Sequence, residues 1–190
     1  ALNVSEFVAL SISNAMLYER AEKLSITDGL TGLDNHQQMQ TVLKNEVVRC
    51  CRYNSTLSVI IMDIDHFKQV NDNFGHLRGD MVLAAVAQCC QKQLRSYDLV
   101  ARFAGDEFIA LTCGCSVEDI DLPIRRLLAS IRTLDLRFNG NFVPTSLSIG
   151  ASVVCSGLDE LTADDLLNSA DQCLYQAKRS GRDRAYRVEL

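Results

Sequence analysis

Two groups of acidic residues stand next to apolar runs that have the composition of β-strands. Asp63 lies near the end of the first run, 57–64, and Asp106 and Glu107 begin the second run after the small-residue pair 104–105. Apolar residues on both sides of that small pair indicate a tight hairpin. If the two acid-tipped strands meet in one sheet, their carboxylates would make a divalent-cation site of the two-metal type.

The acidic residues belong to a longer series of motifs, through which the chain resembles the GGDEF domain, the catalytic domain of diguanylate cyclases. The resemblance covers about residues 25 to 188. The signature begins with Ala104, where the family usually has Gly, and His36 stands where the family often has Arg. The matching segments, in chain order, are 28–35, 63–68, 71–76, 79–80, 104–108, 148–150 and 177–182.

The resemblance implies a Mg²⁺ (or Mn²⁺) site at the acidic strand ends. Asp63 and Asp106 would supply the side-chain ligands, assisted by the carbonyl of Ile64. Glu107 would be catalytic, as a further metal ligand or as a general base. Adjacent strand residues point to opposite faces, so Asp106 and Glu107 cannot reach one metal identically unless the turn twists. Asp65 is expected to cap the following helix; the alternative for Asp63 is the same capping role.

A short helix is expected directly after the first acidic strand, at 66–73. Helix N-termini present free amide donors and a positive dipole end, which suit a phosphate group. The resemblance implies that the amides at His66 and Phe67, together with Lys68 and Gly105, hold the triphosphate of GTP.

Four further residues complete the GTP site that the resemblance implies. Lys178 and Arg182 match the phosphate-binding residues of the family, and their spacing of four would place them on one face of the last helix. Without the motif around them, such a pair would be ordinary solvated surface. Asn71 and Asp80 match the guanine readers, and an Asp that accepts from guanine N1–H and its exocyclic amine would reject adenine.

Arg95 and Asp98 form an RxxD motif a short distance before the signature. The resemblance implies an inhibitory site here, where the Arg and the Asp bind the product cyclic di-GMP. Arg125 or Arg126 on the following helix would complete that site. The alternative is a helix-terminal Arg followed by a turn Asp.

The order of elements predicts an α/β (α+β) sandwich. Its centre would be a mainly antiparallel five-stranded sheet flanked by helices, similar to the palm domain of nucleotidyl cyclases. Strands are expected at 57–64, in a hairpin over 98–113, in a second hairpin that joins 136–138 to 142–154, and at 186–188. Helices are expected at 36–52, 66–73, 78–95, 117–134 and 162–180, the last with Thr162 as its N-cap.

Residues 25–190 would form the GGDEF domain, and residues 1–24 a signalling helix. Apolar positions in the helix repeat at a 3-4-3-4-3 spacing, and Asn14 in that seam could fix a parallel coiled-coil dimer. An ordinary amphipathic helix packed on its own domain is the alternative. The segment 14–20 also resembles the last helix of a GAF sensor domain, which would make an upstream sensor a partner of this domain.

Composition restricts the remaining classes. A formal charge of −5 argues against a nucleic-acid binder. No apolar run approaches the ~20 residues that span a bilayer, and no signal peptide is recognised at the start. The eight cysteines include no CxxC pair, which indicates reduced cysteines in the core and a cytoplasmic location.

Together these features predict a Mg²⁺-dependent diguanylate cyclase that is active as a homodimer, because each subunit would hold one GTP. The alternative is a non-catalytic receptor for GTP or cyclic di-GMP. In that case Ala104 would have disabled turnover, since the first central residue of a primed hairpin needs positive φ, at a cost of ~1 kcal/mol for Ala. A mixed guanine–adenine product is disfavoured by Asp80.

Overall fold

The computed structural model describes residues 8, 12, 26–114, 118–138, 140–154 and 162–190. Most of the helix expected at 1–24 therefore lies outside the described residues, as do the segment that resembles a GAF helix and the positions of the coiled-coil seam. Val8 and Ile12, which are described, are both helical and exposed.

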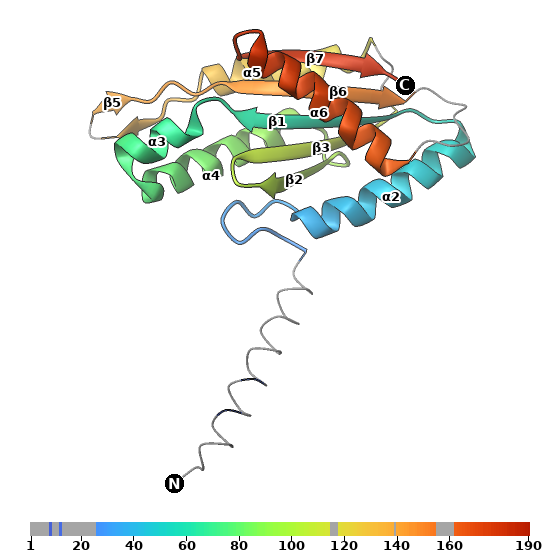
Figure 1. Ribbon diagram of the computed structural model, residues 1–190, viewed down its shortest axis with the longest axis horizontal. Helices are drawn as coiled ribbons and strands as arrows, with labels where there is room; N and C mark the ends of the chain where they lie inside the picture. The colour runs from blue at the N-terminus through green and yellow to red at the C-terminus, as the bar shows by residue number, and fades with distance from the viewer. Residues whose placement is uncertain (1–7, 9–11, 13–25, 115–117, 139, 155–161) are drawn as a thin grey trace.

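A five-stranded sheet forms the centre of the domain (Figure 1). The order across it is β2-β3-β1-β6-β7; the first four strands pair antiparallel, and β7 is parallel to β6. The mainly antiparallel five-stranded sheet is therefore confirmed. The strands are β1 (Leu57–Ile64), β2 (Leu99–Ala104), β3 (Glu107–Cys113), β6 (Leu147–Val154) and β7 (Arg184–Glu189).

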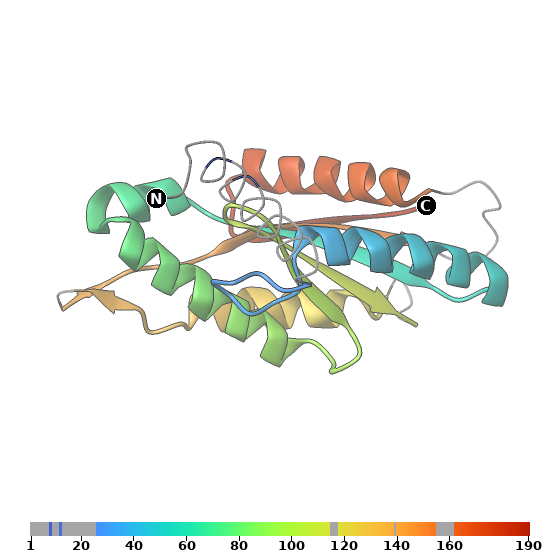
Figure 2. The ribbon, with the colours of Figure 1, turned by 90° about the horizontal axis from the view of Figure 1, so that it is seen from below.

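Helices cover both faces of the sheet (Figure 2). One face packs against α2 (His36–Tyr53) and α6 (Ala163–Arg179), and the other packs against α4 (His76–Gln93) and α5 (Asp121–Arg132). The short α3 (Phe67–Phe74) follows β1 directly and contributes Val70 to the second layer. The expected positions of these helices are confirmed to within a few residues.

The central strand β1 is buried on both faces, which explains its nearly continuous apolar sequence. Ile60, Met62 and Ile64 belong to the core cluster on the α4–α5 side. Val59 and Ile61 belong to the cluster on the α2–α6 side. Side chains alternate between faces along a strand, so Asp63 continues the row that faces α6.

Helix α6 lies in very close contact with β6 at Gly150. A Cβ atom added to Gly150 would lie 2.1 Å from the carbonyl oxygen of Ala170 and 2.2 Å from the amide nitrogen of Leu174. The helix begins with the predicted N-cap, Thr162, whose hydroxyl accepts from the amide of Asp165 in a capping box. The position of α6 is therefore set by its backbone contact with the strand as well as by its apolar face.

The second predicted hairpin is partly wrong. Within the part of the chain that the structure describes, the two-residue strands β4 (Arg137–Phe138) and β5 (Asn141–Phe142) pair only with each other. β6 is a separate strand of the central sheet. Pro144 lies between β5 and β6, and a proline has no amide hydrogen to donate to a ladder. Within the described residues, α5 starts at Asp121, with Pro123 in its first turn, where a proline is tolerated.

None of the six cysteines in the described residues forms a disulfide, and Cys50, Cys89, Cys90 and Cys173 are buried. The expected core position is therefore confirmed for these four cysteines. Among the helices that the structure describes, we find none with the length and apolar character needed to cross a membrane.

Candidate functional site

The acidic residues of the two strands meet at one end of the sheet. Asp63 on β1 lies directly opposite Glu107, the first residue of β3, and opposite Ser148 on β6. Residues directly opposite in an antiparallel pair share one face, so Asp63 and Glu107 project to the α6 side. The amide of Ile64 donates to the carbonyl of Asp106 at 3.3 Å, which fixes the turn against the end of β1.

The hairpin turn consists of Gly105 and Asp106, with Ala104 paired to Glu107 as the last residue of β2. Gly105 has φ +52°, the positive value that a primed turn requires at its first central residue. Ala104 is not among the residues with positive φ. The expected strain at Ala104 is therefore wrong, because the turn is one residue further along the chain than the sequence suggested.

Lys178 at the end of α6 forms an ion pair with Asp63. Its Nζ lies 2.7 Å from Oδ2 of Asp63, and the Asp63 side chain is only 13% exposed. Burial raises the pKa of Asp63 above its usual value, although the Lys178 ammonium opposes the shift and the Asp106 carboxylate adds to it. A cation beside Asp63 therefore offsets the cost of burying its negative charge.

Glu107 shares this environment. Burial, and next the charge of Asp63, raise the pKa of Glu107 above the usual value for glutamate. Within the described residues, no three His, Cys, Asp or Glu side chains converge closely enough to hold a metal ion by themselves. The carboxylates of Asp63 and Asp106 and the carbonyl of Ile64 fit a Mg²⁺ ion. Such an ion usually takes its remaining ligands from water and substrate phosphates.

The residue after the acidic strand makes an unusual helix start. His66 is the N-cap of α3 with φ +59° and without a side-chain cap, and Phe67 and Lys68 form the first turn. The first amides of a helix have no carbonyl partner within it, so the turn offers donors to an anion. Lys68 is exposed.

The prediction that Asp65 caps α3 is wrong. Its carboxylate accepts 2.6 Å hydrogen bonds from the hydroxyls of Ser146 and Ser148, and a 3.0 Å bond from the amide of Asp183. Asp65 is buried, with 6% of its surface exposed. It therefore joins the end of β1 to β6 and to the loop before β7, which is a structural role of a different kind.

Asn71 and Asp80, the predicted guanine readers, lie on the two consecutive helices α3 and α4. The side chain of Asn71 fits against Gly79, where an added Cβ atom would lie 1.9 Å from Oδ1 of Asn71 and 3.2 Å from Cζ of Phe67. Gly79 therefore makes the space in which Asn71 sits, one residue before Asp80.

Arg182 lies outside α6, so the expectation that it shares a helix face with Lys178 is wrong. The helix ends at Arg179, and the amide of Arg182 donates back to the carbonyl of Ala177 in a Schellman-type ending. Arg182 has φ +61° and the next residue, Asp183, has φ +50°. Each left-handed non-glycine residue costs ~1–2 kcal/mol, so the surrounding structure must hold this loop in place.

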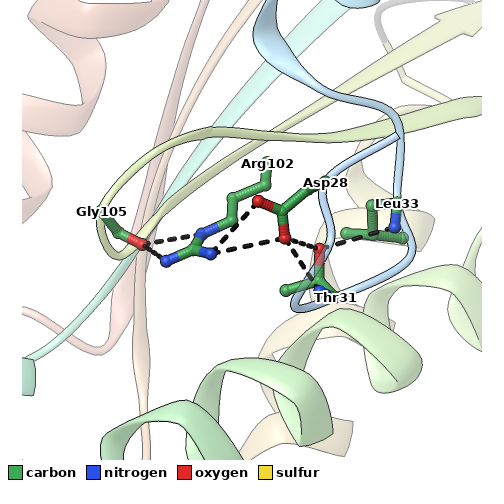
Figure 3. A network of polar contacts seen from close by, with 5 residues as sticks. All are labelled: Asp28, Thr31, Leu33, Arg102 and Gly105. Carbon is green, nitrogen blue, oxygen red and sulfur yellow. Dashed lines mark hydrogen bonds and ion pairs between the residues drawn. The ribbon is translucent and has the colours of Figure 1, made fainter. Parts of the chain in front are cut away.

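A network that local sequence patterns do not predict braces the hairpin turn (Figure 3). Arg102 donates from Nε and Nη2 to the carbonyl of Gly105 at 3.0 and 2.8 Å, and from Nη1 to the carboxylate of Asp28 at 3.3 Å. Asp28 also accepts from the amide and hydroxyl of Thr31. Burial raises the pKa of Asp28, but Thr31 and Arg102 outweigh it and leave the pKa below its ordinary value.

Arg95 and Asp98 lie in the turn between α4 and β2. Oδ2 of Asp98 accepts from the amide of Arg95 at 2.9 Å, and its buried Oδ1 has no hydrogen-bond partner within the described part of the chain. A cavity of about 460 Å³ beside them also includes Asp34. Of the two arginines considered on α5, Arg126 reaches α4, where its Nε lies 3.4 Å from the side chain of Gln93.

The family description "Diguanylate cyclase, GGDEF domain" matches residues 25–184 of this sequence. This chain belongs to the GGDEF family. The diguanylate cyclase DgcP of Pseudomonas aeruginosa is 40% identical over 166 residues, covering 87% of this chain and 24% of that protein. The probable diguanylate cyclase DgcC of Escherichia coli (strain K12) is 36% identical over 165 residues, covering 87% of this chain and 44% of that protein.

The chain thus spans less than half the length of these two curated relatives. Among solved structures, the diguanylate cyclase SiaD of Pseudomonas aeruginosa, in complex with its activator SiaC, has a TM-score of 0.80 at 34% identity, covering 97% of this chain and 71% of that one. The coiled coil and GGDEF domain of DgcB from Caulobacter crescentus, in complex with c-di-GMP, has a TM-score of 0.80 at 22% identity, covering 98% and 97%. The latter supports the fold alone.

Proposed function

We propose that this GGDEF domain is a diguanylate cyclase that condenses two GTP molecules into cyclic di-GMP and releases two pyrophosphates. The observation that carries the proposal is the meeting of Asp63 and Glu107 in one row of the sheet, with Asp106 in the adjoining turn. This acidic row adjoins the amide donors of α3 and the ammonium of Lys178. Cationic and acidic groups at one sheet edge suit a metal-bound triphosphate.

In this proposal, Asp63, Asp106 and the carbonyl of Ile64 would hold Mg²⁺ (or Mn²⁺), which supplies positive charge to the phosphates during transfer. The first turn of α3, from His66 to Lys68, binds the triphosphate through its amides and the lysine. Lys178, Arg182 and the Gly105 turn complete the phosphate site. Asn71 and Asp80 read the guanine base.

The reaction requires two domains. The 3′-hydroxyl of one GTP attacks the α-phosphate of the other, the bond to pyrophosphate breaks, and the second hydroxyl repeats the step in the opposite direction. Glu107 accepts the hydroxyl proton, and the raised pKa that burial gives its carboxyl suits a general base. Because each domain holds one GTP, a homodimer is the active form, and positioning of the two nucleotides supplies much of the catalysis.

We further propose that residues 25–190 are the catalytic domain and that residues 1–24 connect it to a GAF-like sensor. The described cysteines form no disulfide, which suits a cytoplasmic location. Arg95 and Asp98 form the product-inhibition site, and the unpartnered oxygen of Asp98 supports a ligand there. The reach of Arg126 towards α4 favours it over Arg125 as the third residue of that site.

The test is incubation of the purified chain with GTP and Mg²⁺, with products identified by chromatography and mass. Cyclic di-GMP from the wild type and none from Asp106→Asn is the expected result. If the wild type forms no cyclic di-GMP, the assay is repeated at high protein concentration and with a strong dimerisation domain fused to residue 1, since both conditions favour the dimer. If these conditions also give no cyclic di-GMP, while the protein binds GTP or cyclic di-GMP tightly, the receptor hypothesis replaces the cyclase hypothesis.

The receptor alternative has lost one of its arguments. It relied on Ala104 as a strained and disabling substitution. Ala104 instead pairs with Glu107 after a register shift between Arg102 and Ala104, and the positive φ belongs to Gly105. The acidic residues and the guanine readers are also all present. We therefore expect turnover rather than binding alone.

A further inference from the structure

The loop that carries Arg182 is held in a conformation that its sequence alone does not favour. Arg182 and Asp183 are consecutive left-handed residues, and neither is a glycine. Backbone conformations of this kind persist only where the surroundings fix them, and they concentrate at functional positions. The groups that fix this loop are therefore candidates for a role in whatever Arg182 does.

Every backbone polar group of these two residues has a partner. On Arg182, the amide donates to Ala177 at 3.0 Å and the carbonyl accepts from Nε of Arg184 at 2.9 Å. On Asp183, the amide donates to Asp65 at 3.0 Å and the carbonyl accepts from Nη2 of Arg132 at 2.9 Å. The last two partners come from distant parts of the sequence.

Arg132 binds both the side chain and the backbone of Asp183. Its Nε lies 2.8 and 2.9 Å from the two carboxylate oxygens of Asp183, while Nη2 of the same guanidinium holds the carbonyl. Arg132 is the last residue of α5, and it also lines a cavity of about 530 Å³ together with Asp65 and His66. Only a planar guanidinium can serve the side chain and the backbone of one residue in this way.

We propose that Arg132 is a positioning residue for GTP binding, acting through Asp183 to hold Arg182 where it can meet a phosphate. Asp65 also holds Asp183, because it accepts from the Asp183 amide on the buried side. We call Arg132 and Asp65, which hold Asp183 between them, the clamp. The inference rests on the proposed function, in which Arg182 binds the GTP phosphates. It adds a residue from α5, outside all the motifs that carry the family resemblance.

Because the Arg132–Asp183 ion pair is exposed, a role in positioning the loop can be distinguished experimentally from a role in stabilising the fold. The side chains of Arg132 and Asp183 are 48% and 43% exposed, and ion pairs that accessible contribute little to folding stability. Removing Arg132 should therefore leave the fold intact and release the loop. The chain offers a matched control, because Arg187 and Asp121 form another ion pair of 2.7 Å between β7 and α5 that does not touch the Arg182 loop.

The experiment is a double-mutant cycle on GTP affinity. The Kd for GTP with Mg²⁺, the KM and the kcat are measured for wild type, Arg132→Gln, Arg182→Ala and the double variant, with Arg187→Gln as control. We expect Arg132→Gln to raise Kd and KM about tenfold, with kcat changed less than about threefold and Tm within about 2 °C. In the Arg182→Ala background, Arg132→Gln should have no further effect.

Two conservative variants sharpen the result. Arg132→Lys keeps the charge without the fork and should recover only part of the affinity. Asp183→Asn keeps both backbone contacts and tolerates a left-handed φ, so it should be milder than Arg132→Gln. An equal loss from Arg132→Gln with and without Arg182, or an equal loss in Arg187→Gln, would overturn the inference.

The failure of this inference can be distinguished from failure of the proposed function. A wild type that binds GTP without forming cyclic di-GMP overturns only the cyclase, and the Kd cycle still decides the role of Arg132. A wild type that binds no GTP overturns both. Product formation with additive Kd losses overturns only the clamp.

Discussion

Lys178 and Asp63, which are 115 residues apart in sequence, form a 2.7 Å ion pair across the end of the sheet. One partner is the proposed metal ligand and the other is the proposed phosphate ligand. The pair therefore neutralises both groups in the absence of nucleotide, and binding of Mg²⁺ and GTP must replace it with two new contacts. In the proposed site, Lys178 therefore changes its partner from Asp63 to a phosphate group when the nucleotide binds.

Lys178→Met should weaken GTP binding by about tenfold, because a charge-assisted phosphate contact is lost. Titration of the variant with GTP and Mg²⁺ measures the effect. Arg179→Met is the matched control, since Arg179 is the neighbouring residue, exposed and stacked over Tyr175. Equal losses in the two variants would show that only general surface charge is involved.

Glu107→Gln should stabilise the fold at alkaline pH while it abolishes turnover. Burial and the charge of Asp63 raise the folded-state pKa of Glu107 above 4.5. The stabilisation from this group is therefore complete below about pH 4.5 and is lost as the pH rises through the raised pKa. In EDTA at pH 8 the variant should therefore melt at a higher temperature than wild type.

The difference between Glu107→Gln and wild type should shrink as the pH is lowered towards 4.5. Melting curves across that range are the measurement. Glu118→Gln serves as control, because Glu118 is exposed. A Tm for Glu107→Gln below that of wild type at pH 8 would show that the carboxylate is stabilised by its surroundings.

Two glycine-to-alanine changes should affect different properties: Gly79→Ala the affinity for GTP, and Gly150→Ala the stability of the fold. Gly79→Ala displaces the end of the Asn71 side chain, so we expect a rise of about tenfold in Kd for GTP with a small change in Tm. Gly150→Ala collides with the backbone of α6, so we expect a loss of about 3 kcal/mol and a Tm lower by at least roughly 6 °C. Unchanged GTP affinity in Gly79→Ala would remove Asn71 from the guanine site.

Arg102→Lys should lower kcat about tenfold, because a lysine cannot hold the Gly105 carbonyl and Asp28 together. Steady-state kinetics of this variant, of Asp28→Asn and of the double variant test the coupling between the two residues. The losses should not add, since both changes release the same turn. Arg137→Lys, in the exposed pair with Asp135, is the control and should match wild type.

Arg95→Ala should relieve inhibition by cyclic di-GMP. Adding the product to an ongoing reaction should then give an inhibition constant at least about tenfold higher than in wild type. Arg126→Ala should have a similar effect, and Arg125→Ala a smaller one, because Arg126 is the residue that reaches α4. An unchanged inhibition curve in Arg95→Ala would mean that the RxxD match is accidental.

The sequence predicted the elements that carry a strong local signal. The bounds of β1 were predicted correctly because a strand buried on both faces is apolar throughout. The start of α6 was predicted from Thr162, whose hydroxyl is a typical N-cap. The acidic row was predicted from the positions of Asp63 and Glu107 at strand ends, because an antiparallel pairing brings such ends together.

The errors share a different cause. Pro144 divides a stretch that reads as one strand, and the Schellman ending removes Arg182 from a helix whose spacing looks continuous. Asp65 and Arg102 find partners 83 and 74 residues away, respectively. Such contacts depend on how the layers pack, and no local pattern records them. The position of the turn at Gly105 depended on the register of one hairpin.

The contact between Gly150 and α6 gives the two halves of the site different mechanical properties. With no side chain between them, helix and strand are in direct backbone contact, so Lys178 is carried on a helix that is tied closely to the central sheet. The acids of the hairpin are instead carried next to an edge strand, β2, with Arg102 as their side-chain brace. Warming or mild denaturant should therefore disorder the acidic turn first, and activity should disappear before the fold does.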